Sequence, residues 1–399
     1  MFGLDRKGSK ALYGAIFDIG SESVGVAIVE SDAKAKYPNI LFSHRVHMRL
    51  TKKKLDMADR IRIMKETLFS ASLIISRDGL EALALHNKHA KVTKMLVSCS
   101  APWSYTISRN VAYEGETELK VSRDLINDLI GSAETEIEKQ LKAGDTPTDL
   151  TYEVVERATI DVRINDYPVM KPIGLRGKEI SLAHVTGLIP REVIRALTEV
   201  EEKVFPETTI RAHTFMLVLY CVLREMYTAH NSMTIIHVTG DTTEFGVVEG
   251  DTLVESISAP AGLESVIRSM MQNDKETAQE MYTLLKLYHD GNLTDEVASR
   301  VKNALDAYID TVRDALNAKA SSRRFPKVAF IIAPSPFTPL FTTLLTPYLR
   351  DSLGISSEIL NFDDTILGAS PTHDEQDANL SIASRFFHKL HGCGEIDPA

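Results

Sequence analysis

The fold is decided by residues 12–30, which read LYGAIFDIGSESVGVAIVE. An apolar run ends in Asp18-Ile19-Gly20-Ser21 and a second apolar run begins at Val24, which predicts a strand, a tight turn and a returning strand. Gly20 allows close backbone approach, and Ser21 adds N–H and hydroxyl donors in a nest-like turn. Asp18, at the end of the first strand, can hold a hydrated divalent cation. We interpret this hairpin as a phosphate-binding device.

A second copy of this layout occupies residues 234–250, TIIHVTGDTTEFGVVEG. An apolar strand begins at Ile235, a polar turn follows from Thr239 to Thr243, and another apolar strand begins at Phe245. The two copies lie about half a chain apart, as expected for a protein with two similar halves. The sequence therefore contains the same strand-turn-strand clamp twice.

This duplicated clamp resembles the superfamily of actin, sugar kinases and Hsp70, whose two turns grip the phosphates of ATP from opposite sides of a cleft. The resemblance implies an α/β protein with the two-lobed actin-like (ribonuclease H-like) ATPase fold, and it implies ATP and Mg²⁺ as cofactors. With 399 residues, 44% apolar and 25% charged, the chain is long enough to bury two cores of ordinary domain size.

Composition excludes several other classes of protein. The net charge of -10 and the pI near 5.7 lack the basic footprint that nucleic-acid binding requires, so we expect no nucleic-acid partner. The three cysteines, Cys99, Cys221 and Cys393, lie far apart and favour neither a disulfide framework nor a zinc site. Neither a signal-peptide pattern nor a membrane-spanning apolar run is present, so we expect a cytoplasmic protein.

The middle of the chain predicts a small α/β insertion. A strand from Tyr105, an amphipathic helix over residues 122–141, and strands over residues 152–155 and 157–164 with a turn at Asn165-Asp166 lead into the segment KPIGLRG, residues 171–177. Pro172 fixes φ, and Gly174 and Gly177 permit turns that other residues would strain. A helix from Pro190 to Val204 follows.

This segment resembles the inserted SHS2 α+β subdomain of bacterial FtsA, the actin-like cell-division protein, in its Pro-x-Gly-Leu-x-Gly pattern. The pilus-assembly protein PilM shares the fold of that family but not the pattern. The resemblance to FtsA runs from about residue 12 to about residue 385, and it implies partner binding or self-association through the subdomain.

Five regions are predicted on this basis. They are the first lobe (11–104), the inserted SHS2-like subdomain (105–204), the return to the first lobe with a buried connecting helix (205–232), the second lobe (233–378), and a C-terminal helix and tail (379–399). The connecting helix is predicted from FMLVLYCVLREMY, residues 215–227, which is apolar on nearly every side.

The second turn departs from the family pattern Asp-Ile-Gly-Gly-Gly-Thr-Thr. Laid on residues 237–243, the pattern is matched at Gly240, Thr242 and Thr243. His237 replaces the aspartate that helps to hold the metal, and Asp241 replaces a glycine. Because carboxylates repel a triphosphate unless a cation lies between them, either Asp241 is a metal ligand or this turn binds phosphate poorly.

On the nucleoside side of the predicted site, only some residues match the family pattern. Ala333-Pro334 stands in place of the two glycines of the adenosine turn, Gly262 keeps one glycine of another turn, and Lys286 matches the lysine that flanks the nucleoside. The predicted nucleotide-binding residues are Asp18, Gly20, Ser21, Gly240, Asp241, Thr242, Thr243, Gly262 and Lys286. The predicted metal ligands are Asp18 and Asp241, and no catalytic residue is assigned.

The last predicted helix begins at Leu380 and ends at His391, and it has one apolar stripe beside Arg385 and Lys389. We expect it to pack as the closing helix of the second lobe. The alternative is contact with a membrane surface, as FtsA tails make, which would place the protein peripherally at the inner face of the membrane.

The resemblance implies an FtsA-like cytoplasmic cell-division scaffold that binds ATP as a conformational ligand. We expect that it does not hydrolyse the ATP. One alternative is an active Mg-dependent ATPase whose metal site is rebuilt around Asp18 and Asp241. The other is a PilM-like adaptor of type IV pilus assembly that captures a short peptide between the inserted subdomain and the first lobe. Its partners would be division or pilus assembly proteins.

Overall fold

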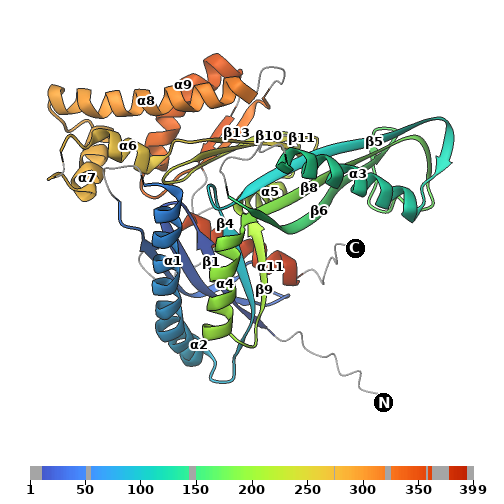
Figure 1. Ribbon diagram of the computed structural model, residues 1–399, viewed down its shortest axis with the longest axis horizontal. Coiled ribbons are helices and arrows are strands. Elements are labelled where there is room, and N and C mark those ends of the chain that lie inside the picture. The colour runs from blue at the N-terminus through green and yellow to red at the C-terminus, as the bar shows by residue number, and fades with distance from the viewer. Residues whose placement is uncertain are drawn as a thin grey trace.

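The computed structural model describes residues 11–50, 55–142, 150–273, 275–319, 325–355, 358–361 and 377–392. Two five-stranded sheets of equivalent strand order form the two lobes (Figure 1). The sheet of the first lobe has the order β3-β2-β1-β4-β9, and that of the second lobe has the order β12-β11-β10-β13-β14. In the first lobe the strands are β1 (Leu12–Ile19), β2 (Ser23–Ser31), β3 (Asn39–His47), β4 (Val92–Cys99) and β9 (Thr209–Thr214). In the second they are β10 (Met233–Val238), β11 (Thr243–Glu249), β12 (Thr252–Ala259), β13 (Val328–Ile332) and β14 (Glu358–Asn361).

The two predicted clamps start these two sheets. β1 pairs antiparallel with β2 up to Ile19 and Val24, and β10 pairs antiparallel with β11 up to Val238 and Thr243. Each first strand also pairs in parallel with a later strand, β1 with β4 and β10 with β13. Both first strands are therefore central and are covered on both faces, which explains their nearly continuous apolar sequence.

Helices cover both faces of the first sheet. On one face lie α1 (Met57–Ile74), which continues through a π-helical turn (Ile75–Gly79) into α2 (Leu80–His86), and α4 (Arg191–Val204). The other face packs against α5 (Phe215–Met226) and α11 (Ala378–Gly392). α1 begins after Asp56, whose carboxylate accepts the Asp59 N–H at 2.8 Å and so caps the helix.

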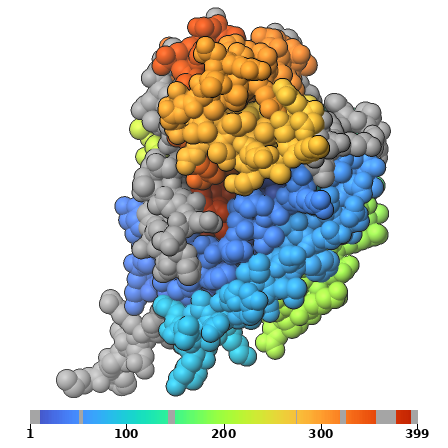
Figure 2. All heavy atoms as spheres, turned by 90° about the vertical axis from the view of Figure 1, so that its left-hand side faces the viewer, coloured from blue at the N-terminus to red at the C-terminus, as the bar shows by residue number. Residues whose placement is uncertain are grey.

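The helix α5 joins the two lobes. Its apolar side chains pack against residues of β1 and β2 and also against residues of β10 and β13, in one continuous core. The residues from Phe215 to Tyr220, together with Val222 and Leu223, are buried, which confirms that the helix is apolar and buried on nearly every side. On the far side of the second sheet lie α6 (Leu263–Met270), α7 (Ala278–His289), α8 (Asp295–Lys319) and α9 (Thr338–Leu353). Figure 2 shows the yellow and orange helices of the second lobe resting directly above the blue helices of the first.

The insertion forms its own sheet, of order β5-β8-β6-β7, which extends away from the lobes (Figure 1). Its elements are β5 (Tyr105–Lys120), α3 (Arg123–Lys142), β6 (Tyr152–Ile164), β7 (Tyr167–Pro168) and β8 (Arg176–Pro190). α3 covers one face through a small core that includes Leu129, Ile164 and Ile180. At the far end Gly174 has φ +95°, a left-handed conformation that favours glycine.

Two predicted placements are wrong. α4, expected in the insertion, buries Val193, Leu197 and Val200 in the core of the first lobe. α11, expected in the second lobe, packs against α5, β1 and β2 instead. The ring of Phe387 lies over Gly14, where an added Cβ would be 2.2 Å from a ring carbon. α11 thus completes the first lobe.

The burial of α11 also contradicts membrane contact through the helix from Leu380 to His391. The apolar stripe consists of Ala383, Phe386, Phe387 and Leu390; the first three are buried in the protein and Leu390 is half-buried. Their apolar surface is therefore not available to lipid. Residues 393–399 of the predicted tail, with Cys393, lie outside the described residues. Among the residues described, no helix has the length and apolar character needed to span a bilayer.

Candidate functional site

The site lies where the two clamp turns meet. We call residues 20–22 the first turn and residues 239–242 the second turn. The Ser21 hydroxyl donates to Thr239 Oγ1 at 3.0 Å, and the Asp241 N–H donates to Ser21 Oγ at 2.9 Å. The Gly240 N–H donates to Glu22 Oε2 at 2.8 Å. The structure therefore places the turns against each other, as the duplicated pattern predicts, and joins them by direct hydrogen bonds.

The first turn is held from below by the chain that follows β4. The indole N–H of Trp103 donates to the Gly20 carbonyl at 2.8 Å, and the Ser100 N–H donates to the Ile19 carbonyl at 3.0 Å. The Gly20 N–H closes the turn on the Ser23 carbonyl at 2.9 Å. The single tryptophan of the chain is thus fully buried and supports the turn.

The second turn is held by the start of α6. The Leu263 and Glu264 N–H groups donate to the Thr239 and Gly240 carbonyls at 2.9 and 2.7 Å. A Cβ at Gly262 would lie 2.2 Å from the Thr239 carbonyl oxygen, so only glycine permits this close approach. The helix N-terminus, which elsewhere is a ready anion site, is used here to bind the protein's own carbonyls.

Asp18 lies behind the first turn, fully buried. Arg45 Nη2 donates to its carboxylate at 2.8 Å, and the Ser98 hydroxyl donates to it at 3.0 Å. Arg45 also donates through Nε to Asp377 at 2.5 Å. Burial raises the pKa of Asp18, and the charge of Arg45 offsets this only in part. Although burial alone would raise it, Arg45 holds the pKa of Asp377 below its ordinary value.

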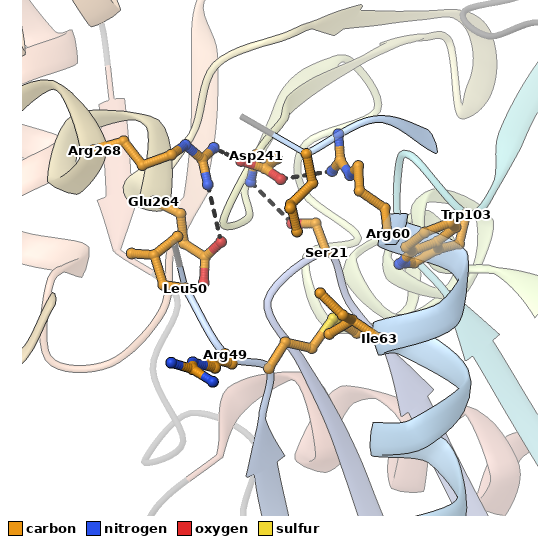
Figure 3. Close-up of a pocket in the computed structure, with 11 residues that line it drawn as sticks. Ser21, Arg49, Leu50, Arg60, Ile63, Trp103, Asp241, Glu264 and Arg268 are labelled. Carbon is orange, nitrogen blue, oxygen red and sulfur yellow. Dashed lines mark hydrogen bonds and ion pairs between the residues drawn. The ribbon is translucent and has the colours of Figure 1, made fainter. Parts of the chain in front are cut away.

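Asp241 has a different set of partners. Arg60 Nη2 donates to one carboxylate oxygen at 2.6 Å, and Arg268 Nη2 donates to the other (Figure 3). Arg60 in turn lies over the Trp103 ring, 6.0 Å from its centroid. Burial, together with the nearby charge of Arg60, lowers the pKa of Arg268 to about 10. Two guanidinium groups thus neutralise the carboxylate that replaces the family glycine.

Glu264 is a buried carboxyl group with a strongly raised pKa. Burial and the neighbouring charge of Glu22 raise its pKa to about 8, against the opposing effect of Arg60. A Cβ on Gly240 would lie 2.6 Å from Glu22 Cβ and 3.1 Å from Glu264 Cγ. Both glutamates therefore flank the same glycine of the second turn.

A small cavity adjoins these groups. Its volume is about 40 Å³, and Arg49, Arg60, Trp103, Glu264 and Arg268 are among the residues that line it (Figure 3). A small-molecule site usually has about 300–1,000 Å³. The cavity can hold a few waters but not a nucleotide.

The predicted cofactors do not fit this arrangement. Mg²⁺ would compete with Arg45 for Asp18 and with Arg60 and Arg268 for Asp241. Asp18 bonds to Arg45 and Ser98, whereas Asp241 bonds to Arg60 and Arg268, so each carboxylate has its own set of partners. Within the described ranges, no cluster of three or more His, Cys, Asp or Glu side chains could hold a metal ion. The amides that would bind phosphate are also bonded, to Ser21 and Glu22.

His237, at the position of the family aspartate, is a buried contact between the lobes. Its ring centroid lies 4.5 Å from that of Phe215, and Nδ1 lies 3.7 Å from Glu244 Oε2. The same Glu244 oxygen accepts the Ala101 N–H at 3.2 Å. These residues therefore connect β10 and β11 of the second lobe to the first lobe.

The remaining predicted residues divide into two groups. Thr242 and Thr243 are buried, and Thr243 Oγ1 bonds to the Ala261 carbonyl at 2.8 Å and lies 2.9 Å from the Tyr308 hydroxyl. Lys286 is exposed on α7 and does not line the cavity. Sequence reasoning missed the residues that dominate the site, which are Glu22, Arg45, Arg60, Glu244, Glu264 and Arg268. Of these, Glu22 alone had a local signal, its place in the turn beside Ser21.

Comparison with solved structures supports the architecture. The chain is similar to one from the PilM–PilN type IV pilus biogenesis complex, with a TM-score of 0.58 and 12% identity over 95% of this chain and 98% of that one. It is also similar to the ethanolamine utilization protein EutJ from Carboxydothermus hydrogenoformans (TM-score 0.44, 10% identity, 94% and 89% covered). A Bacteroides thetaiotaomicron protein with actin-like ATPase fold and unknown function has a TM-score of 0.40 at 11% identity, with 90% and 94% covered.

Neither a family model nor a curated protein matches the sequence. The structural likeness concerns the fold, and the predicted two-lobed α/β, actin-like ATPase fold is confirmed.

Proposed function

We propose that this protein is an adaptor of actin-like fold that holds other proteins in an assembly and does not turn over ATP. The observation that carries the proposal is the ion pair between Arg45 and Asp18, 2.8 Å long and shielded from solvent on the Asp18 side. In the superfamily that the sequence resembles, this aspartate helps to hold the metal. Here a guanidinium, anchored by Asp377, supplies the positive charge instead.

Two groups that hydrolysis could use are engaged in other contacts. A general base must be able to accept a proton from water, but both carboxylate oxygens of Asp241 are bonded to arginines. His237 is buried between Phe215 and Glu244, and it does not line the cavity. These contacts support a structural role for the two turns, which is to hold the lobes in one relative position.

The inserted sheet offers a surface for partners. Large apolar side chains are exposed near its far end, and we call four of them the apolar tip: Tyr167, Met170, Ile173 and Leu175. Met170 is completely exposed and Tyr167 is 75% exposed. Because exposed apolar clusters mark interaction sites in soluble proteins, the tip supports protein binding or self-association through the SHS2-like insertion.

Two assemblies remain as candidates. The similarity to a chain of the PilM–PilN complex over nearly the whole of both chains favours a type IV pilus assembly adaptor. The segment KPIGLRG supports the FtsA-like division scaffold, because the Pro-x-Gly-Leu-x-Gly pattern belongs to that family. Both roles would place the protein in the cytoplasm, with its partners near the membrane.

A phosphate-release assay with ATP and Mg²⁺ tests the absence of turnover. We expect the wild type, Asp18→Ala and Asp241→Ala to release phosphate no faster than a buffer blank. Turnover in the wild type that both substitutions abolish would contradict the proposal and establish the Mg-dependent ATPase instead. Circular dichroism of each variant would show whether it is folded, so that a lost signal can be assigned to chemistry.

A further inference from the structure

The two amides of the second turn have their acceptors on the first turn. The Gly240 N–H donates to the carboxylate of Glu22 at 2.8 Å, and the Asp241 N–H donates to the hydroxyl of Ser21 at 2.9 Å. Successive backbone N–H groups in such a turn form a concavity that binds anions. In this protein the anion in that position is the side chain of Glu22.

Several contacts hold Glu22 in place. Ser21 has one hydroxyl hydrogen, and both Glu22 Oε2 at 2.9 Å and Thr239 Oγ1 at 3.0 Å lie within its reach. Thr239 uses its own hydroxyl hydrogen on the Thr242 carbonyl. Glu22 Cβ is also close enough to Gly240 that an added Cβ there would lie 2.6 Å away. A residue other than glycine at 240 would push Glu22 out of the turn.

The surroundings are suited to an anion larger than a carboxylate. Arg60 and Arg268 approach the second turn from opposite sides and meet at Asp241, and Arg49 lines the adjoining cavity (Figure 3). The pKa of Glu264, raised to about 8 by burial and by Glu22, keeps this carboxyl mainly protonated at neutral pH. A phosphoryl group that replaced Glu22 would meet two guanidinium groups and a neutral acid, which can donate a hydrogen bond.

We propose that Glu22 is a built-in occupant of the anion position at the Gly240 amide, and that a phosphorylated ligand reaches this amide only when Glu22 leaves. Glu22 thereby lowers the affinity for phosphate, and its departure breaks one of the hydrogen bonds that join the two turns. This inference goes beyond the proposed function, and it does not depend on whether ATP is hydrolysed.

Titration calorimetry with inorganic pyrophosphate tests the proposal. Pyrophosphate is the better probe because it needs no nucleoside pocket. We compare the wild type with Glu22→Ala, Glu22→Gln and the control Glu66→Ala, an exposed glutamate on α1. We expect Glu22→Ala to bind at least about tenfold more tightly than the wild type, because it no longer fills the donors with a charged group. Glu22→Gln keeps an acceptor for the Gly240 N–H but loses the charge, so its affinity for pyrophosphate should lie between those of the wild type and Glu22→Ala.

Equal dissociation constants for the wild type and both Glu22 variants would overturn the proposal. The proposal would also be overturned if the double variant Glu22→Ala with Arg268→Ala bound pyrophosphate as tightly as Glu22→Ala does, because the ligand would then be bound elsewhere. If Glu22→Ala does not fold, Glu22→Gln alone decides, and it must still bind more tightly than the wild type.

Hydrogen exchange gives a readout that needs no binding isotherm. The Gly240 amide should exchange faster in Glu22→Ala than in the wild type, because its acceptor is removed, and pyrophosphate should slow it again. Unchanged exchange over residues 239–242 would count against Glu22 as the occupant. An active wild-type ATPase would refute the proposed function, whereas these affinities and exchange rates would still decide the present inference.

Discussion

The guanidinium of Arg45 lies 2.8 Å from the carboxylate of Asp18 and joins it to Asp377, which lies just before α11. The two residues bring together the end of β1, the edge strand β3 and the C-terminal helix. The carboxylate that the sequence predicts as a metal ligand is therefore part of the framework that keeps α11 on the first lobe.

Replacing Arg45 by Met should destabilise the protein by about 3 kcal/mol, because it leaves Asp18 and Asp377 without their cation in a buried position. Protonation of Asp18, whose pKa burial already raises, limits the loss. Urea unfolding followed by circular dichroism measures the change. Arg62→Met is the matched control, since Arg62 makes exposed ion pairs on α1, and little change is expected there. Equal stabilities of the two variants would refute the prediction.

Glu264 should make stability depend on pH. Its pKa in the folded chain is about 8, above the ordinary 4.5, so between these values the folded state keeps a proton that the unfolded state has released. The free energy of unfolding therefore falls as pH rises through this window. Between pH 5 and pH 8, the free energy of unfolding of Glu264→Gln should rise by at least about 1 kcal/mol relative to that of the wild type. Denaturant unfolding at several pH values measures this, and Glu66→Gln should follow the wild type. Parallel curves for Glu264→Gln and the wild type would contradict the assignment.

Gly262→Ala should destabilise the second lobe by about 1–3 kcal/mol, because the new Cβ would lie 2.2 Å from the Thr239 carbonyl oxygen and backbone would have to move. Gly131→Ala is the control, since nothing lies within 4 Å of the added Cβ inside α3. It should stabilise by about 0.5–1 kcal/mol through helix propensity. Thermal unfolding compares the two. A neutral Gly262→Ala would show that α6 does not rest against the second turn.

Phe387→Ala should lower the free energy of unfolding by about 3–5 kcal/mol, as expected for a fully buried aromatic side chain in a core. Leu85→Ala should change stability by less than about 0.5 kcal/mol, because Leu85 is 83% exposed. Liposome co-sedimentation of both variants should match the wild type. Loss of lipid binding in Phe387→Ala, with stability unchanged, would restore the membrane role of this helix.

The apolar tip should mediate association. The double variant Met170→Glu with Ile173→Glu should weaken self-association by at least about tenfold, because it places charges where apolar side chains would be buried. Leu85→Glu should not weaken self-association, because Leu85 is also exposed but lies on α2. Sedimentation velocity over a range of concentrations measures this. A wild type that stays monomeric throughout, or a double variant that associates as the wild type does, would rule out self-association through the tip.

The sequence predicts the framework well for a physical reason. The apolar runs of β1 and β10, each followed by a short polar turn, are compatible with few structures other than buried strands. Their repetition at two places in the chain predicts two similar lobes. The all-round apolar pattern of α5 likewise allows only a buried helix. The long-range partners of those elements are less constrained. The stripe of α11 specifies that it must be buried but not which lobe buries it.

By itself, therefore, the sequence determined the duplicated clamps, the connecting helix and the departure of the second turn from its family pattern, because these depend on neighbouring residues. Only the tertiary structure decided which partners the charged side chains have. Arg45 lies 27 residues from Asp18, and Arg60 lies 181 residues from Asp241. A carboxylate that could hold a metal ion and one paired with an arginine look the same in sequence. The partner is chosen by the packing of distant segments, and burial then makes that choice costly to reverse.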